Sequence, residues 1–262
     1  MPELPEVESQ LRYFRSTALG QCVERVRITS PNIIKKPAAQ AFARGLRGRC
    51  FQQASRRGKY LIVTLDNRRT MILHFGMGGD LGYYTTARDR PEYTRLEFIL
   101  KNGWRLAFTC PRKICRVMLV DKPDDVPALR EMGPEPLGES FSLAFFERLI
   151  EEHPRRQIKA LLMDQRLIAG VGNIYADEIL FEARVRPDRL ASTLSEEEIK
   201  RLHRETRRVL RRSIRTAGDD KFPSDFLSLR ASRGKGCPVC GGPIKKKTIA
   251  GRTAHFCPRC QV

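Results

Sequence analysis

The sequence lacks several features that define whole classes of protein. It has no run of about 18 apolar residues, so no segment is expected to span a membrane. Its first residues include no apolar stretch of the kind found in secretory signals. It also has no internal repeat and no low-complexity segment. We therefore expect a cytoplasmic protein in a reducing setting, where its eight cysteines serve a purpose other than forming disulfides.

Acidic residues are few relative to basic ones. The 262 residues include 30 Asp and Glu against 49 Lys and Arg, which gives a net charge of +19 and a pI near 10.1. The basic residues are distributed along the chain and do not form a single tail. Such a charge favours a polyanionic partner, and nucleic acid before a membrane surface.

The chain begins with a helical pattern. Residues 5–19 are predicted to form a helix because Val7, Leu11 and Phe14 recur on one face, and Gly20 is expected to end it. This helix is expected to anchor the N-terminus against a core.

A strand-like pattern follows. Short β-rich runs occupy residues 22–29, 60–65, 70–75, 96–100, 105–109 and 116–120. Asn102-Gly103, between two of these runs, predicts a two-residue hairpin turn. The spacing predicts an antiparallel β-sandwich or barrel within residues 21–120.

The second half of the chain is predominantly helical. Residues 121–139 are rich in proline and glycine, which indicates a domain boundary. Ser142 is a candidate cap for the next helix, and residues 157–163 are predicted to form another. The chain as a whole is therefore predicted to be an α+β protein.

A long basic helix is predicted near the end of this half. Ser195 and Glu198 form a capping box, and the helix is expected to run to about Ala217, where Gly218 stops it. The arginines of residues 207–215 are interpreted as a solvated face that sets the electric field.

A glycine-containing turn precedes another helix. Gly170 and Gly172 come just before Asn173, and this arrangement is expected to leave backbone N–H groups open to a phosphate oxygen. The alternative is an ordinary turn between two helices.

The last residues contain the most specific spacing. Two Cys-x-x-Cys pairs are separated by sixteen residues, and their members are Cys237, Cys240, Cys257 and Cys260. This spacing predicts one structural zinc ion held by four thiolates, with iron or two disulfides as the alternatives. Because the four cysteines fill the coordination shell, His255 is expected to be a surface residue. The segment is too short to form a core, so the metal is expected to supply its fold.

The first residues contain a candidate nucleophile. Once Met1 is removed, the chain begins with the secondary amine of Pro2, beside the carboxylate of Glu3. Such an amine attacks an aldehyde-like carbon and leaves a cationic imine. Lys59, in a basic turn before a strand, is a second candidate, since such a turn can point it into a groove. The alternatives are an inert helix start and a solvated charge cluster.

These features, in this order, resemble the Fpg/Nei family of bifunctional DNA glycosylase/AP lyases, which excise oxidised bases. The resemblance covers nearly the whole chain and rests on MPELPEVE at the N-terminus, MDQRLIAGVGNIYADE at Met163–Glu178 and the four-cysteine ribbon. It implies a β-sandwich domain with flanking helices (1–130), a helix–two-turn–helix domain (131–232) and a zinc-finger ribbon (233–262). DNA is expected to lie between the first domain and the others.

The resemblance also implies catalytic roles. Pro2 matches the Schiff-base nucleophile that attacks C1′ of the damaged nucleotide, and Glu3 matches the acid that assists opening of the sugar. Lys59 matches a residue that contacts a DNA phosphate and assists protonation. Glu6 is a candidate for positioning water or the base.

Further residues match positions that bind DNA. Asn173 and Arg252 match a clamp on the phosphates around the lesion, and His74 matches another phosphate contact. Met77 matches the residue that enters the void left by the flipped base. Lys159 matches a basic position near the DNA that matters for processing oxidised purines.

One stretch departs from the family pattern. Many members have Asp-Pro-Arg-Arg-Phe-Gly where this chain has Cys-Pro-Arg-Lys-Ile-Cys, from Cys110 to Cys115. Arg112 is retained and is expected to face the orphaned base, while Ile114 replaces the aromatic wedge. The two cysteines are predicted to be small buried hydrophobes, with a redox role as the alternative.

The predicted function is therefore base-excision repair by glycosylase and β,δ-eliminating AP lyase activity. The resemblance favours 8-oxoguanine and formamidopyrimidines as substrates. The alternatives are an endonuclease VIII-like enzyme for oxidised pyrimidines and hydantoins, a non-catalytic nucleic-acid-binding protein and a zinc-ribbon transcription factor. The expected partner is damaged double-stranded DNA, bound by a monomer that needs no membrane and associates with the bacterial nucleoid while acting on DNA.

Overall fold

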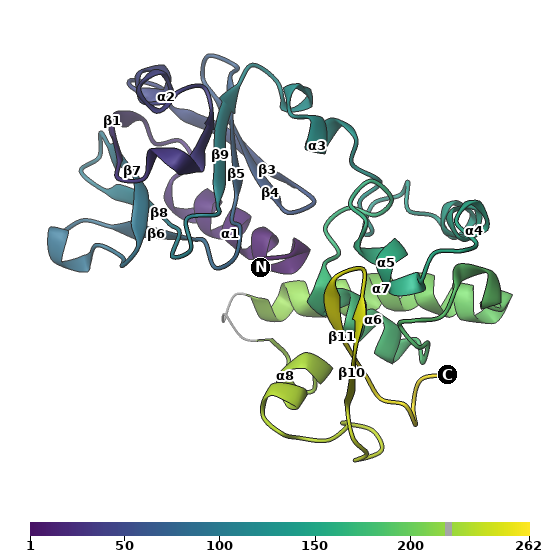
Figure 1. Cartoon of the computed structure of the whole chain (residues 1–262). Helices are drawn as coiled ribbons and strands as arrows, with labels where there is room; N and C mark the ends of the chain where they lie inside the picture. Colours follow the sequence, from purple (N-terminus) through teal and green to yellow (C-terminus); the bar gives the residue numbers. More distant parts are fainter. Residues whose placement is uncertain (218–221) are drawn as a thin grey trace. The chain divides into compact units, whose positions relative to one another are not determined.

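A computed structural model of the chain describes residues 1–217 and 222–262. These residues divide into two units (Figure 1). The first unit comprises Met1–Pro2 and Glu6–Glu131, and the second comprises Glu3–Pro5 and Met132–Val262. The glycine predicted to stop the long basic helix, Gly218, lies outside the described residues.

Two β-sheets form the first unit (Figure 1). One has the strand order β1-β7-β8-β6 and the other β2-β9-β5-β4-β3. Every pairing is antiparallel except that of β2 with β9. The strands are β1 (Val23–Ile28), β2 (Ile34–Lys36), β3 (Phe51–Arg57), β4 (Tyr60–Leu65), β5 (Thr70–His74), β6 (Asp80–Tyr84), β7 (Thr94–Leu100), β8 (Arg105–Thr109) and β9 (Arg116–Val120).

The core of the first unit lies between these sheets. Phe51 of β3 contacts Phe98 of β7 across the sandwich, with ring centroids 5.7 Å apart. Phe14 of the first helix meets Phe51 edge-on at 5.2 Å. Val7, Leu11 and Phe14 are all buried, so the predicted helix face and the predicted β-sandwich are both confirmed.

Short helices accompany the sheets. The helical elements of this part of the chain are α1 (Leu4–Thr17), α2 (Ala39–Leu46), α3 (Pro127–Arg130) and the single 3₁₀ turns η1 (Pro31–Ile33), η2 (Ala87–Asp89) and η3 (Pro123–Asp125). The first helix ends at Thr17, three residues before the glycine expected to stop it.

The six predicted strands are present with shifts of one or two residues, but three strands were not predicted. These are β2, β3 and β6, whose sequences are short or polar and carry a weak period-two pattern. The predicted two-residue turn at Asn102-Gly103 is wrong. Leu100 N–H donates to the Trp104 carbonyl at 2.9 Å, so the loop has three residues and places Gly103 at φ +84°.

The expectation that no cysteine pairs as a disulfide is also wrong for four of them. Cys22 bonds to Cys50, and Cys110 bonds to Cys115. Cys22 and Cys50 face each other across an isolated antiparallel bridge, which brings the two side chains within disulfide reach. Cys110 and Cys115 are nevertheless buried, as predicted.

The second unit combines helices with a two-stranded hairpin (Figure 1). Its elements are α4 (Leu143–Glu152), α5 (Ile158–Met163), α6 (Asn173–Glu182), the 3₁₀ turn η4 (Ala191–Thr193), α7 (Glu196–Thr216), α8 (Leu227–Ser232), β10 (Lys245–Ile249) and β11 (Arg252–Phe256). The helical domain and the terminal ribbon are confirmed.

Both predicted helix caps are present. Ser142 Oγ accepts the N–H of Phe145 at 3.1 Å. At α7, Ser195 Oγ accepts the Glu198 N–H at 3.3 Å, and the Glu198 carboxylate accepts the Ser195 N–H at 2.9 Å. The capping box therefore starts α7 where the sequence indicated.

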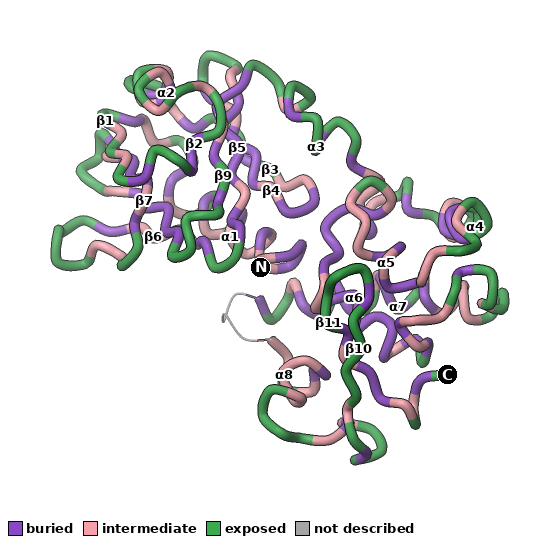
Figure 2. Tube along the Cα trace, in the orientation of Figure 1, coloured by how far each residue is buried: buried purple, intermediate pink, exposed green. Residues whose placement is uncertain are grey.

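Helix α6 forms the centre of the second unit. Seven consecutive residues, Tyr175 to Phe181, are buried, and the helix contacts α5, α7, α8 and β11. Figure 2 shows α6 as a buried segment, while the β10–β11 hairpin is largely exposed. Within the two described ranges, no helix is long and apolar enough to cross a membrane.

Candidate functional site

The carboxylate of Glu3 caps the N-terminus of α6. Its oxygens accept the N–H groups of Gly172 at 2.7 Å, Ile174 at 3.0 Å and Tyr175 at 3.3 Å. Glu3 is only 2% exposed. Three N–H donors and the helix dipole together stabilise a negative charge at this point. The chain therefore holds the residue next to Pro2 in one fixed position.

The loop before α6 is shaped to receive the N-terminal segment. Leu4 N–H donates to the Gly170 carbonyl at 3.1 Å. A side chain at Gly170 would meet Leu4 at 2.8 Å, and the φ of Gly170 is +80°, so only glycine fits without strain. Gln165 braces the same loop by accepting the Gly170 N–H at 2.9 Å and donating to the Val171 carbonyl at 2.7 Å. Sequence reasoning missed the role of Gln165, although it lies within the MDQ motif.

The prediction of open N–H groups at this turn is wrong for three of them. The N–H groups of Gly172, Ile174 and Tyr175 point at Glu3 and are occupied by the chain's own carboxylate. Asn173 stands beside them, and its Oδ1 is buried with no hydrogen-bond partner among residues 1–217 and 222–262.

Lys159 forms a buried ion pair with Asp177. Its Nζ lies 2.6 Å from the Asp177 carboxylate and donates to the Thr253 carbonyl of β11 at 3.1 Å. Burial lowers the pKa of Lys159, while the negative charges of Asp177, Glu3 and Glu178 oppose this shift. The ammonium is 0% exposed, so it is directed at the ribbon and not at solvent.

His255 also contacts this buried group. The backbone N–H of His255 donates to Asp177 Oδ2 at 2.9 Å, and the ring Nδ1 lies 3.5 Å from the same carboxylate. The side chain is only 16% exposed, so the prediction of a surface histidine is wrong. Sequence reasoning missed Asp177, which connects α5, α6 and the hairpin through one carboxylate.

The four predicted zinc ligands converge. The Sγ atoms of Cys237, Cys240, Cys257 and Cys260 all lie within 4.8 Å of one another. Cys237 and Cys260 are separated by 3.7 Å, and Cys240 and Cys257 by 3.5 Å. Four thiolates about 2.3 Å from a tetrahedral zinc ion would be about 3.8 Å apart, so the cluster fits zinc and leaves no open coordination position.

The hairpin of the ribbon presents Arg252. Ile249 pairs with Arg252, so Ala250 and Gly251 form a two-residue turn, with φ values of +47° and +71°. This is the geometry of a tight primed turn, which places Arg252 at the exposed end of the hairpin. Lys159 Nζ donates a hydrogen bond to the carbonyl of Thr253, the residue that follows Arg252.

In the first unit, Lys59 lies in the turn between β3 and β4. Arg57 pairs with Tyr60, which leaves Gly58 at φ +53° and Lys59 in the turn. Lys59 is only 5% exposed, so it does not belong to a solvated charge cluster. Pro2 is half-buried, and Glu6 is half-buried in the first turn of α1.

His74 ends β5 beside this turn. Burial, and after it the charges of Arg116 and Lys59, lower the pKa of His74 to about 4. Its Nδ1 accepts the Gly76 N–H at 3.2 Å, which places the proton of the neutral ring on Nε2. His74 is therefore a neutral hydrogen-bond donor near pH 7.

Two neighbouring loops gather the predicted void-filling residues. Arg112 Nη1 lies 3.5 Å from Met77 Sδ. Met77 is 36% exposed and Ile114 is 46% exposed. Gly76 packs so closely on Ile114 that a side chain there would approach its backbone to 2.9 Å. The structure thus brings Met77, Arg112 and Ile114 together.

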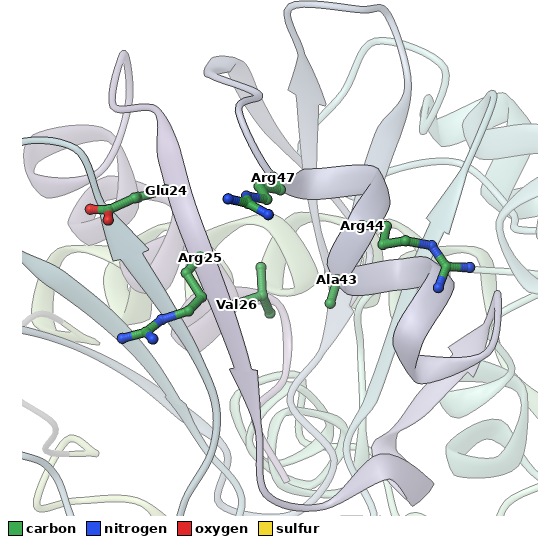
Figure 3. Close-up of a pocket in the computed structure, with 6 residues that line it drawn as sticks. All are labelled: Glu24, Arg25, Val26, Ala43, Arg44 and Arg47. Atoms are coloured by element: carbon green, nitrogen blue, oxygen red, sulfur yellow. The ribbon is translucent and has the colours of Figure 1, made fainter.

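Two hollows elsewhere in the described residues show no catalytic arrangement. One of about 410 Å³ lies between β1 and α2 and is lined by Glu24, Arg25, Val26, Ala43, Arg44 and Arg47. Figure 3 shows Arg44 pointing to the opposite side from Glu24, Arg25 and Arg47. Another, of about 390 Å³, is lined by five arginines of α7, of which Arg204, Arg208 and Arg212 are paired with carboxylates.

The sandwich, the α6 turn and the four-thiol ribbon define a helix–two-turn–helix protein with a zinc finger. Comparison with known families agrees. Residues 1–117 match the formamidopyrimidine-DNA glycosylase N-terminal domain, residues 132–222 its H2TH domain, and residues 234–262 the zinc finger found in FPG and IleRS. The chain belongs to the formamidopyrimidine-DNA glycosylase family.

Relatives match over the full length. The formamidopyrimidine-DNA glycosylase of Pelotomaculum thermopropionicum is 38% identical, with 100% of this chain and 99% of that protein covered. The crystal structure of the MutM (Fpg) protein from Thermus thermophilus is 38% identical, with a TM-score of 0.83 and coverage of 99% and 98%. A Lactococcus lactis Fpg complex with oxidised-pyrimidine DNA is 30% identical, with a TM-score of 0.90 and coverage of 99% of each chain.

Proposed function

We propose that this protein is a base-excision-repair DNA glycosylase with AP lyase activity. One observation carries the proposal: the Glu3 carboxylate is locked onto the first turn of α6, which fixes the residue adjoining Pro2. An inert terminus needs no such anchor. Family membership and the relatives' complexes with abasic-site DNA support the same conclusion.

Pro2 is the proposed nucleophile. After removal of Met1, the lone pair of its nitrogen forms a bond to C1′, and the damaged base departs with the electrons of the glycosidic bond and takes up a proton. The Pro2 nitrogen then loses its proton, and its lone pair expels O4′ from C1′ while O4′ takes up a proton. The iminium formed by this ring opening acidifies the C2′ hydrogens. Loss of one C2′ proton expels the 3′ phosphate, and a second elimination expels the 5′ phosphate, which leaves a one-nucleotide gap.

Three carboxylate and ammonium groups assist these steps. Glu3, held beside Pro2, is proposed to exchange a proton with the opening sugar. Lys59 is proposed to contact a phosphate and assist protonation, and Glu6 to position water or the base. The damaged base must leave the helical stack before any of these groups reaches it.

The remaining residues are proposed to bind the DNA. Arg252, exposed on the hairpin, and the Asn173 side chain contact phosphates. His74 donates Nε2–H to another phosphate. Lys159 is proposed to act on DNA through the ribbon, because its ammonium holds Thr253 and Asp177.

Oxidised purines are the preferred substrate class in this proposal. A relative from Lactococcus lactis has been crystallised with N7-benzyl-Fapy-dG DNA, and the same enzyme with an oxidised pyrimidine. Oxidised pyrimidines are the second candidate, favoured by the exposed aliphatic Ile114, which cannot stack on a base. The protein is proposed to act as a monomer on nucleoid DNA, with residues 1–130, 131–232 and 233–262 as its three functional parts.

Borohydride trapping on abasic-site duplexes tests the activity. We expect a covalent protein–DNA adduct with the wild type and its loss in Pro2→Gly. Intact Met1 on the active protein, measured by mass spectrometry, would overturn the proposed nucleophile. DNA binding without an adduct would assign the chain to the non-catalytic alternative.

A further inference from the structure

The Cys110–Cys115 disulfide closes the loop that carries Arg112 and Ile114. Cys110 follows the last residue of β8, and Cys115 precedes the first residue of β9. The four residues between them are exposed, whereas both cysteines are almost fully buried. The covalent bond therefore fixes the base of an exposed loop and leaves its tip accessible.

The same disulfide braces the neighbouring loop that carries Met77. Cys115 Sγ lies 3.2 Å from the Phe75 carbonyl oxygen. A side chain at Gly79 would come within 2.9 Å of that sulfur, so the second loop folds closely around it. Gly76, at φ +55°, packs equally closely on the backbone of Cys115. Loops 75–79 and 110–115 thus share one buried anchor.

We propose that the Cys110–Cys115 disulfide is a positioning element for Met77, Arg112 and Ile114. It holds these side chains in the arrangement that fills the space vacated by the damaged nucleotide. The inference rests on the proposed function, because the three side chains have this task only if the protein flips a base. Both cysteines are bonded to each other and buried, and they are proposed to act only through these side chains, so neither is a catalytic residue.

The disulfide orders the loop of residues 110–115 before DNA binds. A loop whose side chains are already arranged loses less conformational freedom when DNA binds than one that must be ordered at that moment. This smaller loss of conformational entropy favours the complex in which the damaged base is flipped out of the duplex. An abasic site has no base to flip, so cleavage of an abasic strand depends less on the loop.

Peptide mapping tests whether the bond is present in the folded protein. Free thiols are first blocked by alkylation without reductant, and the protein is then digested with trypsin, which cleaves after Arg112 and Lys113 inside the loop. Peptides 106–112 and 114–116 are expected to remain linked and to separate only after reduction. Separately alkylated peptides would overturn the proposal, whatever the activity of the protein.

Matched double variants test the positioning role. Cys110→Ser/Cys115→Ser removes the proposed element, and Cys22→Ser/Cys50→Ser removes the other disulfide, beside β1 and β3. We expect the first variant to lose roughly 10-fold in single-turnover excision of 8-oxoguanine, with less than about a threefold change on a preformed abasic site. Its preference for cytosine over adenine opposite the lesion should also shrink, and the control should match the wild type.

Equal losses on both substrates, or equal losses in both double variants, would overturn the positioning role and indicate general destabilisation. If the first variant fails to fold, the Cys22→Ser/Cys50→Ser variant treated with dithiothreitol replaces it, with the same variant untreated as its control. The reagent is oxidised to its cyclic disulfide, and the Cys110–Cys115 disulfide takes up two electrons and two protons to become two thiols. Failure of the wild type to form a borohydride adduct on abasic DNA would count against the proposed function instead, and the peptide map separates the two outcomes.

Discussion

Replacing Glu3 with glutamine or alanine separates its structural task from its chemical one. In the structure one oxygen accepts the N–H groups of Gly172 and Tyr175, and the other accepts that of Ile174. Glutamine retains one acceptor oxygen, but it replaces the other with an NH₂ group that faces a backbone N–H donor at the start of α6. Alanine removes every acceptor and leaves three donors without their partner.

The magnitude follows from those contacts. A buried donor left unsatisfied costs about 1–3 kcal/mol, so Glu3→Ala is expected to lose roughly 3–5 kcal/mol of unfolding free energy after partial relaxation. Glu3→Gln mismatches one donor and loses the charge at the helix start, so it is expected to lose roughly 1–3 kcal/mol. Ser195→Ala, at the exposed cap of α7, is the matched control and should cost about 1 kcal/mol.

Urea unfolding of the three variants measures these losses, and borohydride trapping is performed where each variant is fully folded. We expect Glu3→Gln to be folded at about 25 °C and to form far less adduct than the wild type. A Glu3→Ala variant no less stable than Ser195→Ala would refute the account of Glu3 as the buried cap of α6.

Four further outcomes are expected. Removing zinc with a chelator should unfold residues 237–260 and abolish DNA binding while the β-sandwich stays folded, as followed by circular dichroism. Arg252→Ala should reduce the slope of log affinity for DNA against log salt concentration by about 0.9. An unchanged slope would mean that Arg252 contacts no phosphate. Because the folded pKa of His74 is about 4 and its ordinary value is 6.5, its contribution to stability is present above pH 6.5 and is lost as pH falls towards 4. The loss is at most roughly 3 kcal/mol, and a His74→Gln variant with the same pH dependence of unfolding would contradict it. Ile114→Phe should strengthen discrimination for cytosine opposite 8-oxoguanine and lower relative activity on dihydrouracil; strong discrimination in the wild type that is unchanged in the variant would exclude this role for Ile114.

Local patterns predicted much of the fold and site. Val7, Leu11 and Phe14 lie on one helix face because a single period governs them, and the two Cys-x-x-Cys pairs converge because each forms its own tight turn. The caps of α4 and α7 depend on side chains three residues from their donors. These features need no knowledge of distant contacts.

Contacts between residues far apart in the sequence could not be predicted from such local patterns. Glu3 meets Gly172 across 169 positions, and Lys159 meets Thr253 across 94. Nothing near Lys159 in the sequence indicates that Asp177 neutralises it. The β3 segment, with its polar residues, was missed because its pairing with β4 supplies the order that its composition does not.

The most direct test of the account is the location of the covalent adduct. The wild type is reduced with borohydride on abasic-site DNA, the DNA is trimmed by nuclease, and the protein is digested with trypsin and examined by mass spectrometry. We predict a sugar remnant on the α-nitrogen of Pro2, in a peptide of residues 2–12 that lacks Met1. A remnant on Lys59 or another lysine, with peptide 2–12 unmodified, would contradict it.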